Sequence, residues 1–331
     1  MHAMASNFPT EFVTTLCNHL QMNKSHFISR GLLEKIVSDT QKKLSVSGDF
    51  TVDVRQYGEK NEHYTVVEIV GNDMPFIVDS TSHEIKACAL NPLEVLYGSA
   101  KRGDGSDCFI MYYFFRRSEQ FDEKDIKKRL LKVLECVQYT TCDWESIQDI
   151  VRENIKKLSD NSNKGGEHVG QLIKLLEWLL NDNFLLFGST YLSYNGEAFV
   201  EDDRSKLGLV RSDFYEKKVS VKINNFHNED IVFVRKTGSR SLVHRSAQLD
   251  AVYIKQFDLN GEVEGVVMIV GFFASLTSYQ SVQDIPVISS KISNVMERYD
   301  SPPQSFNNKE MLTVIQSFPI TELFQITEDV L

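Results

Sequence analysis

The sequence predicts an α+β protein built from small sheet-and-helix domains, and two observations support this fold class. Short strand-like runs, at residues 50–54 and 65–70, are separated by segments whose apolar residues recur every three or four positions. A polar run at residues 159–166 ends in two glycines and has too few apolar side chains to form a core, so it predicts a linker. The length of 331 residues is enough for about two domains.

The first domain is predicted from the order of its elements. A helix pair is expected between residues 8 and 44, and a strand at residues 50–54 follows it. The chain then runs strand, helix, strand, strand and helix, at residues 65–70, 76–89, 93–97, 108–115 and 124–137. This order is most of the split β-α-β unit of ferredoxin-like domains, with residues 50–54 available as the fourth strand. We expect four strands with two helices on one face of the sheet.

Around and beyond the linker the sequence predicts a mainly β region with flanking helices. Helices are expected at residues 144–158, 169–180, 285–299 and 309–317. The strands are expected at residues 184–194, 231–235, 252–257 and 263–273. Asn260 and Gly261 lie between the last two strands, and this pair is typical of a hairpin turn that needs positive φ angles.

Net charge and cysteine content exclude some functions for this protein and indicate the cellular compartment in which it acts. The net charge is −10 without any block of lysines or arginines, which argues against nucleic-acid binding because that binding relies on clustered cations. The five cysteines are scattered without a C-x-x-C pair and fit neither a disulfide framework nor a zinc site. No signal peptide is visible, and no apolar run approaches the roughly 18 residues that cross a membrane. We expect a cytoplasmic protein with neither nucleic-acid nor membrane partners.

The sequence lacks the usual signatures of catalysis and cofactor binding. Gly103, Asp104 and Gly105 are the nearest match to a dinucleotide loop, but the third glycine is missing and a strand follows, so they predict a hairpin turn. No P-loop, G-x-S-x-G or H-E-x-x-H sequence occurs, and the eight histidines are dispersed. No nucleophile with an adjacent activating base is visible. We therefore predict no catalytic residue, no metal ligand and no cofactor site in this chain.

The first candidate site is the strand-to-helix junction at residues 71–76. Asn72 or Asp73 is expected to cap the helix, and Pro75 fits its first turn. The amides and dipole of a helix N-terminus suit a small carboxylate, such as that of an amino acid. The ligand-binding candidates are Gly71, Asn72, Asp73, Met74, Pro75 and Phe76. The alternative is a capped turn whose amides are satisfied internally.

The second candidate site is the cationic run at residues 235–245. Four cations, a histidine and two serines at the end of a strand can hold an anion or the carboxylates of a neighbouring domain. The strand-like alternation around Leu242 and His244 indicates that some of these side chains are held in place. The candidates for anion or interdomain contacts are Arg235, Lys236, Ser239, Arg240, His244 and Arg245. The alternative is a solvated basic loop.

These segments resemble the large bacterial NAD-specific glutamate dehydrogenases, whose chains are several times longer. Three blocks in the same order carry the resemblance, at residues 67–80, at 175–184 with 207–211, and at 236–250 with 271–275. The similarity runs from about residue 64 to the end of the chain and includes residues 322–326. Gly238 stands where the family is expected to have asparagine, so the resemblance does not fix the local geometry of the basic run.

The resemblance implies a regulatory region, because the N-terminal part of this family looks like ACT and PAS-type domains and the dehydrogenase domain lies far downstream. The expected order is a helical segment, an ACT-like domain of ferredoxin-like fold, a helix with linker, a PAS-like or second ACT-like domain, and C-terminal helices, at residues 1–48, 49–142, 143–167, 168–280 and 281–331. NAD is implied as the cofactor of the full-length enzyme and not of this chain. The implied partners are the downstream catalytic domain, further copies in a homo-oligomer, and an amino-acid effector.

Three function classes follow from these observations. The leading hypothesis is a regulatory and oligomerisation segment of an NAD-dependent glutamate dehydrogenase, the full-length enzyme that converts L-glutamate to 2-oxoglutarate by oxidative deamination. The alternative is a purely structural module, in which the basic run contacts another domain or subunit and no ligand binds. The third class is an autonomous enzyme, which would require distant residues to converge into a site.

Overall fold

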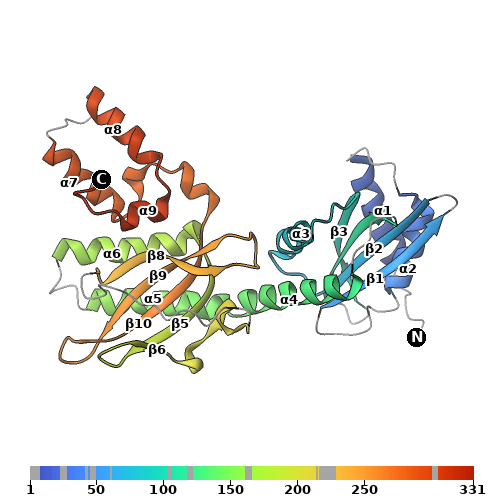
Figure 1. Ribbon diagram of the computed structural model, residues 1–331, viewed down its shortest axis with the longest axis horizontal. Coiled ribbons are helices and arrows are strands. Elements are labelled where there is room, and N and C mark those ends of the chain that lie inside the picture. Colours follow the sequence, from blue (N-terminus) through green and yellow to red (C-terminus); the bar gives the residue numbers. More distant parts are fainter. Residues whose placement is uncertain are drawn as a thin grey trace. The chain divides into compact units, whose positions relative to one another are not determined.

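The computed structural model describes residues 8–22, 28–41, 44, 50–59, 62–102, 106–117, 122–160, 166–213, 215, 229–299 and 305–331. The chain divides into two compact units (Figure 1). Unit 1 comprises Met1–Gln138 together with Leu242–Ser246, and unit 2 comprises Tyr139–Ser241 and Ala247–Leu331. The turn expected at residues 103–105 and most of the expected linker lie outside the described residues.

The sheet of unit 1 has four strands in the order β1-β2-β4-β3. They are β1 (Thr51–Glu59), β2 (Glu62–Gly71), β3 (Glu94–Lys101) and β4 (Asp107–Arg116). β2 and β3 both pair antiparallel with β4, so they run parallel to each other with β4 between them. This is the geometry of a split β-α-β unit, in which helix α3 (Ile77–Ala87) connects β2 to β3. β1 completes the sheet as the antiparallel neighbour of β2.

Helices cover both faces of this sheet, whereas the sequence predicted helices on one face only. Helices α1 (Phe8–Met22) and α2 (Arg30–Gln41) share a core with one face, which includes Tyr112 and Phe114 of β4. On the other face, the Tyr113 hydroxyl lies 2.8 Å from the Thr81 hydroxyl of α3.

Helix α4 (Glu123–Cys142) also reaches this sheet, since Lys127 pairs with Asp53 of β1 at 3.1 Å. Successive strand residues point to opposite faces. Because every residue of β4 from Cys108 to Phe115 is buried, both faces of the sheet require cover.

The sheet of unit 2 is antiparallel, with the order β6-β5-β10-β9-β8 and a short β7 beside β5. Its strands are β5 (Phe184–Tyr194), β6 (Phe199–Glu201), β7 (Leu207–Gly208), β8 (Val232–Arg240), β9 (Gln248–Phe257) and β10 (Val263–Phe273). Helices α5 (Trp144–Asp160) and α6 (Gly166–Trp178) share a core with this sheet. The sheets and helices of the two units confirm the α+β class, and β6 and β7 escaped prediction because two or three residues are too short to show alternation.

One local prediction in unit 2 was wrong. In the β9–β10 hairpin only Gly261 has a positive φ, of 84°, and Asn260 does not. The Asp258 carboxylate shapes this turn by accepting from the backbone amides of Asn260 and Glu262, each at 2.9 Å. β8 ends at Arg240, and the residues after it form bends.

The C-terminal part of unit 2 consists of short helices around their own core. They are η6 (Ser275–Tyr279), η7 (Val282–Asp284), α7 (Ile288–Arg298), α8 (Phe306–Gln316) and α9 (Ile320–Gln325). α9 is joined to the sheet by Thr321, whose hydroxyl donates to Asp250 of β9 at 2.7 Å. The described helices include none long and apolar enough to cross a membrane, and all five cysteine thiols are unbridged.

Candidate functional site

The β2–α3 junction is not capped in the way that the sequence predicts. The N-cap residue is Phe76, which adopts a left-handed conformation with φ of 73°, and no side chain accepts from the first turn. Pro75 therefore precedes the helix instead of lying in its first turn. Asn72 and Asp73 are four and three residues before the N-cap position, so their side chains do not cap the helix.

Asn72 and Asp73 instead bind the far end of β3. The Asn72 side-chain oxygen accepts from Arg102 Nη1 at 2.9 Å, and the Asp73 carboxylate accepts from the Ser99 hydroxyl. Gly71 is the last residue of β2, where a Cβ atom would lie 2.0 Å from the Phe50 ring. The junction is thus fixed by contacts with neighbouring strands, and glycine is required at its start.

Arg102 is a residue of this site that the sequence pattern does not single out. Its side chain is only 8% exposed, and its Nε has no hydrogen-bond partner. No carboxylate in the described part of the chain forms an ion pair with it, and Asn72 is its one side-chain partner there. A buried charge without a counter-charge is costly. The guanidinium therefore retains an unused capacity to bind a carboxylate, for which its planar fork is suited.

The structure divides the basic run between two surroundings. Arg235 pairs with Glu229, and Lys236 Nζ lies 2.6 Å from Asp250, both inside unit 2. Ser239 is buried on β8 and Arg240 is exposed at the end of that strand. His244 and Arg245 belong to unit 1. The run is therefore not one anion-binding surface, because two of its cations are already neutralised by acidic side chains.

His244 lies against the start of α3, so it brings together the two candidate segments within unit 1. Its backbone amide donates to Ser80 Oγ at 2.8 Å, and its Nδ1 lies 3.0 Å from an Asp79 carboxylate oxygen. Its ring centroid is 5.7 Å from that of Phe76. Both His244 and Phe76 have positive φ angles, of 66° and 73°. Such backbone strain persists only where surrounding contacts hold it, which marks this contact as specific.

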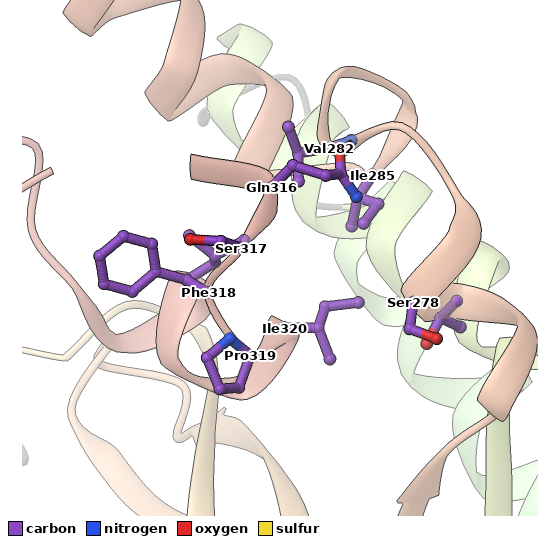
Figure 2. Close-up of a pocket in the computed structure, with 10 residues that line it drawn as sticks. Ser278, Val282, Ile285, Gln316, Ser317, Phe318, Pro319 and Ile320 are labelled. Carbon is purple, nitrogen blue, oxygen red and sulfur yellow. Dashed lines mark hydrogen bonds between the residues drawn. The ribbon is translucent and has the colours of Figure 1, made fainter. Parts of the chain in front are cut away.

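A pocket in unit 2 lies between the 3₁₀ turns and the last two helices (Figure 2). Its volume is about 270 Å³, and Val282, Ile285 and Ile320 are among the side chains that line it. The Gln316 amide on its wall accepts from the Val282 backbone N–H at 3.1 Å and donates to the Gln280 carbonyl at 2.8 Å. This wall therefore offers apolar contact and has little spare hydrogen-bonding capacity.

Two segments of the chain match sequence families of glutamate dehydrogenase. Residues 18–100 match the family described as glutamate dehydrogenase, ACT1 domain, and residues 285–331 match glutamate dehydrogenase, helical motif 1. The NAD-specific glutamate dehydrogenase of Pseudomonas aeruginosa is 28% identical over 314 residues, and that of Halomonas elongata is 23% identical over 311. These alignments cover 85% and 83% of the chain.

The chain is related to the large NAD-specific glutamate dehydrogenases. The resemblance to the N-terminal region of these enzymes, predicted from the sequence blocks, is thereby confirmed. The chain spans 19% of the length of each of the two relatives.

The β2–α3 junction does not fit the NAD of these glutamate dehydrogenases. A dinucleotide's pyrophosphate needs several glycines in the turn and a helix start free of negative charge. The junction has Gly71 alone, and the first turn of α3 carries the Asp79 carboxylate, which would repel phosphate.

Proposed function

We propose that this chain is a regulatory and scaffolding part of an NAD-dependent glutamate dehydrogenase, and that Arg102 and Asn72 in unit 1 recognise the carboxylate of an amino-acid effector. The full-length enzyme would oxidise L-glutamate to 2-oxoglutarate with NAD, using a catalytic domain elsewhere in the same protein. In this proposal the sheet of unit 1 is an ACT-type domain of ferredoxin-like fold. The chain would act in the cytoplasm as part of a homo-oligomer.

The observation that carries the proposal is the buried guanidinium of Arg102. Its Nε lacks a hydrogen-bond partner and its charge lacks an ion pair in the described chain. A carboxylate supplies both, and bonds between charged groups are about twice as strong as neutral ones. The exposed Asp73 carboxylate, which lies next to Asn72, offers a partner for the ammonium group of the same effector.

For unit 2 we favour the PAS-like alternative over a second ACT-like domain. Its strands β8, β9 and β10 follow one another through short connections, at residues 241–247 and 258–262, without an intervening helix. A ferredoxin-like order would place a helix between paired crossover strands. The arrangement of unit 2 therefore supports a different regulatory fold in the second half.

Calorimetric titration of the chain and of the full-length enzyme with a panel of amino acids tests the effector site. We expect Arg102→Gln to weaken binding about tenfold or more, because it removes a charged hydrogen-bond donor. Lys101→Gln is the matched control, since Lys101 is the adjacent cation and is exposed with Asp107 as its partner. Asn72→Asp should also abolish binding, because the new carboxylate pairs with Arg102 internally, and it should raise the melting temperature.

A purely structural role is the second candidate, and the contact of His244 with Asp79 and Ser80 favours it. In that case the basic run contacts protein and binds no ligand. An absence of amino-acid binding by both the chain and the full-length enzyme would remove the effector site and leave this contact function.

A further inference from the structure

We propose that a cavity in unit 2 binds a small zwitterion of the amino-acid type. The cavity has a volume of about 300 Å³, within reach of the size of small-ligand sites. Its polar lining consists mainly of Glu201, Asp203, Lys206, Arg211, Asp213 and Tyr215. The site is separate from Arg102 of unit 1, and the inference stands whether or not the proposed effector site exists.

The cavity contains a buried hydroxyl group, that of Tyr215, which has no hydrogen-bond partner among the described residues. The residue is 7% exposed, and its hydroxyl is buried without a hydrogen-bond partner. Burial raises the pKa of this hydroxyl, so it stays protonated and able to donate. An unpaired buried hydroxyl is destabilising, and an acceptor oxygen on a ligand would relieve that cost.

Arg211 provides a fixed cation at the same cavity. Its Nε pairs with Asp143 at 3.1 Å, and its guanidinium lies 4.8 Å from the centre of the Tyr139 ring. Asp143 is itself held, because it accepts from the Gly208 amide at 2.7 Å. A guanidinium has five N–H donors. Beyond the Nε bond, the described chain supplies no further acceptor, so the terminal amino groups remain available for a carboxylate.

Asp213 provides the opposite charge. It is exposed and forms no ion pair or hydrogen bond with other described residues. Lys206 is paired with two acids, Glu201 at 3.1 Å and Asp203 at 2.5 Å, and the Asp203 hydrogen bond raises the pKa of Lys206. Within the described part of the chain, Arg211 is paired with Asp143 alone, through its Nε. The groups left over are the terminal amino groups of Arg211, the Tyr215 hydroxyl and the Asp213 carboxylate. A molecule with one carboxylate and one ammonium group complements all three.

Calorimetry and thermal shift with glycine and larger amino acids test this site. Glycinamide, which lacks the carboxylate, and N-acetylglycine, which lacks the ammonium, should bind more weakly than glycine. Tyr215→Phe should weaken binding about threefold to tenfold through loss of one hydrogen bond, and Asp213→Asn about tenfold through loss of a charged one. Because Asp213 has no described partner, its replacement should leave the melting temperature unchanged.

Two matched variants establish whether the zwitterion binds at this cavity. Tyr253→Phe removes the hydroxyl of another buried tyrosine in unit 2 that does not line the cavity, and Arg102→Gln removes the effector site of unit 1. Both should bind at the unit 2 cavity as the unsubstituted chain does. The inference is overturned if no zwitterion binds at millimolar concentration, or if Tyr215→Phe and Asp213→Asn together leave affinity unchanged.

Discussion

Among the described residues, each unit has one buried carboxylate in its sheet, and the hydrogen-bond partners of the two carboxylates differ. In unit 1, Glu68 on β2 is 2% exposed and accepts from the Thr40 hydroxyl of α2 at 2.9 Å. Thr40 in turn lies 2.8 Å from the Tyr112 hydroxyl. A threonine hydroxyl has one proton to give, so Tyr112 donates to Thr40 when Thr40 donates to Glu68. In unit 2, Asp250 is held by Lys236 at 2.6 Å and by Thr321 at 2.7 Å.

The described hydrogen-bond partner of Glu68 is thus a hydroxyl group, whereas Asp250 also forms an ion pair. The hydroxyl chain of unit 1 lies in the core and fastens α2 to the sheet. The Asp250 carboxylate fastens α9 to the sheet, but its cation Lys236 is 44% exposed and therefore subject to screening by salt. One carboxylate thus makes the polar contact between α9 and the sheet of unit 2, beside the stacked rings of Phe273 and Phe324. In unit 1 the polar contact between α2 and the sheet involves two hydroxyl groups as well as a carboxylate.

Of the changes considered, Asp250→Ala should lower the unfolding free energy the most. It leaves the buried Thr321 hydroxyl without its acceptor and Lys236 without its acid, and we expect unit 2 to lose about 3 kcal/mol of unfolding free energy. Both tryptophans, Trp144 and Trp178, are in unit 2, so urea denaturation followed by tryptophan fluorescence reports this unit.

The control for that measurement is Asp149→Ala. Asp149 also pairs with a cation, Arg152, but its side chain is 67% exposed and the pair should contribute little. If the two substitutions shift the urea midpoint equally, Asp250 does not attach α9 in the way described.

Alkaline pH should cause the next largest loss of stability, and it should destabilise both units. Burial raises the pKa of Tyr113 in unit 1 and of Tyr253 in unit 2 from the ordinary value of 10 to about 12. The unfolded chain therefore releases these protons first. Stability is fully present below pH 10, and each tyrosine removes about 2–3 kcal/mol as pH rises from 10 to 12.

Denaturation at a series of alkaline pH values, with phenolate absorbance as a second signal, measures this loss. Tyr113→Phe should reduce the loss of stability of unit 1 between pH 10 and 12 by the contribution of one tyrosine. It should leave the pH dependence of unit 2, which is followed by tryptophan fluorescence, unchanged. A phenolate that forms near pH 10 in the folded chain at both positions would contradict the assignment.

The smallest expected effect concerns the His244 contact in unit 1. His244→Ala removes the interaction with Asp79, which is 56% exposed, so the loss should be under about 1 kcal/mol. His244→Gly should lose less than His244→Ala, since glycine adopts the observed φ of 66° without steric cost. Thermal unfolding followed by circular dichroism compares the two variants. A glycine variant that is less stable than the alanine variant would show that backbone strain at this position is unimportant.

Much of unit 1 could be predicted from local pattern, and its candidate site only in part. The run of buried residues from Cys108 to Phe115 marks a strand in any context, and Gly71 and Pro75 mark the end of β2 and the start of a turn. The cap at Phe76 could not be predicted, because a left-handed aromatic residue goes against local preference and is held by tertiary contacts.

Arg102 was missed for a related reason. In the sequence it looks like one more turn cation, and only the fold buries it beside Asn72, thirty residues earlier. Tyr215 is similar, since its importance comes from a hydroxyl left without a partner inside a cavity. Neither property has a sequence signature, because both depend on which distant groups surround the side chain.

By itself the sequence determined the α+β class, most helices and strands, and the relationship to the NAD-specific glutamate dehydrogenases. Hydrophobic periodicity and the family blocks involve residues that are close together in the chain, so they can be recognised without the fold. The tertiary structure alone decided that His244 contacts α3, that Lys236 pairs with Asp250, and that Arg102 is buried without a carboxylate partner among the described residues. Hydrogen bonds and ion pairs need approach within a few ångströms, and only the folded chain determines which groups come that close.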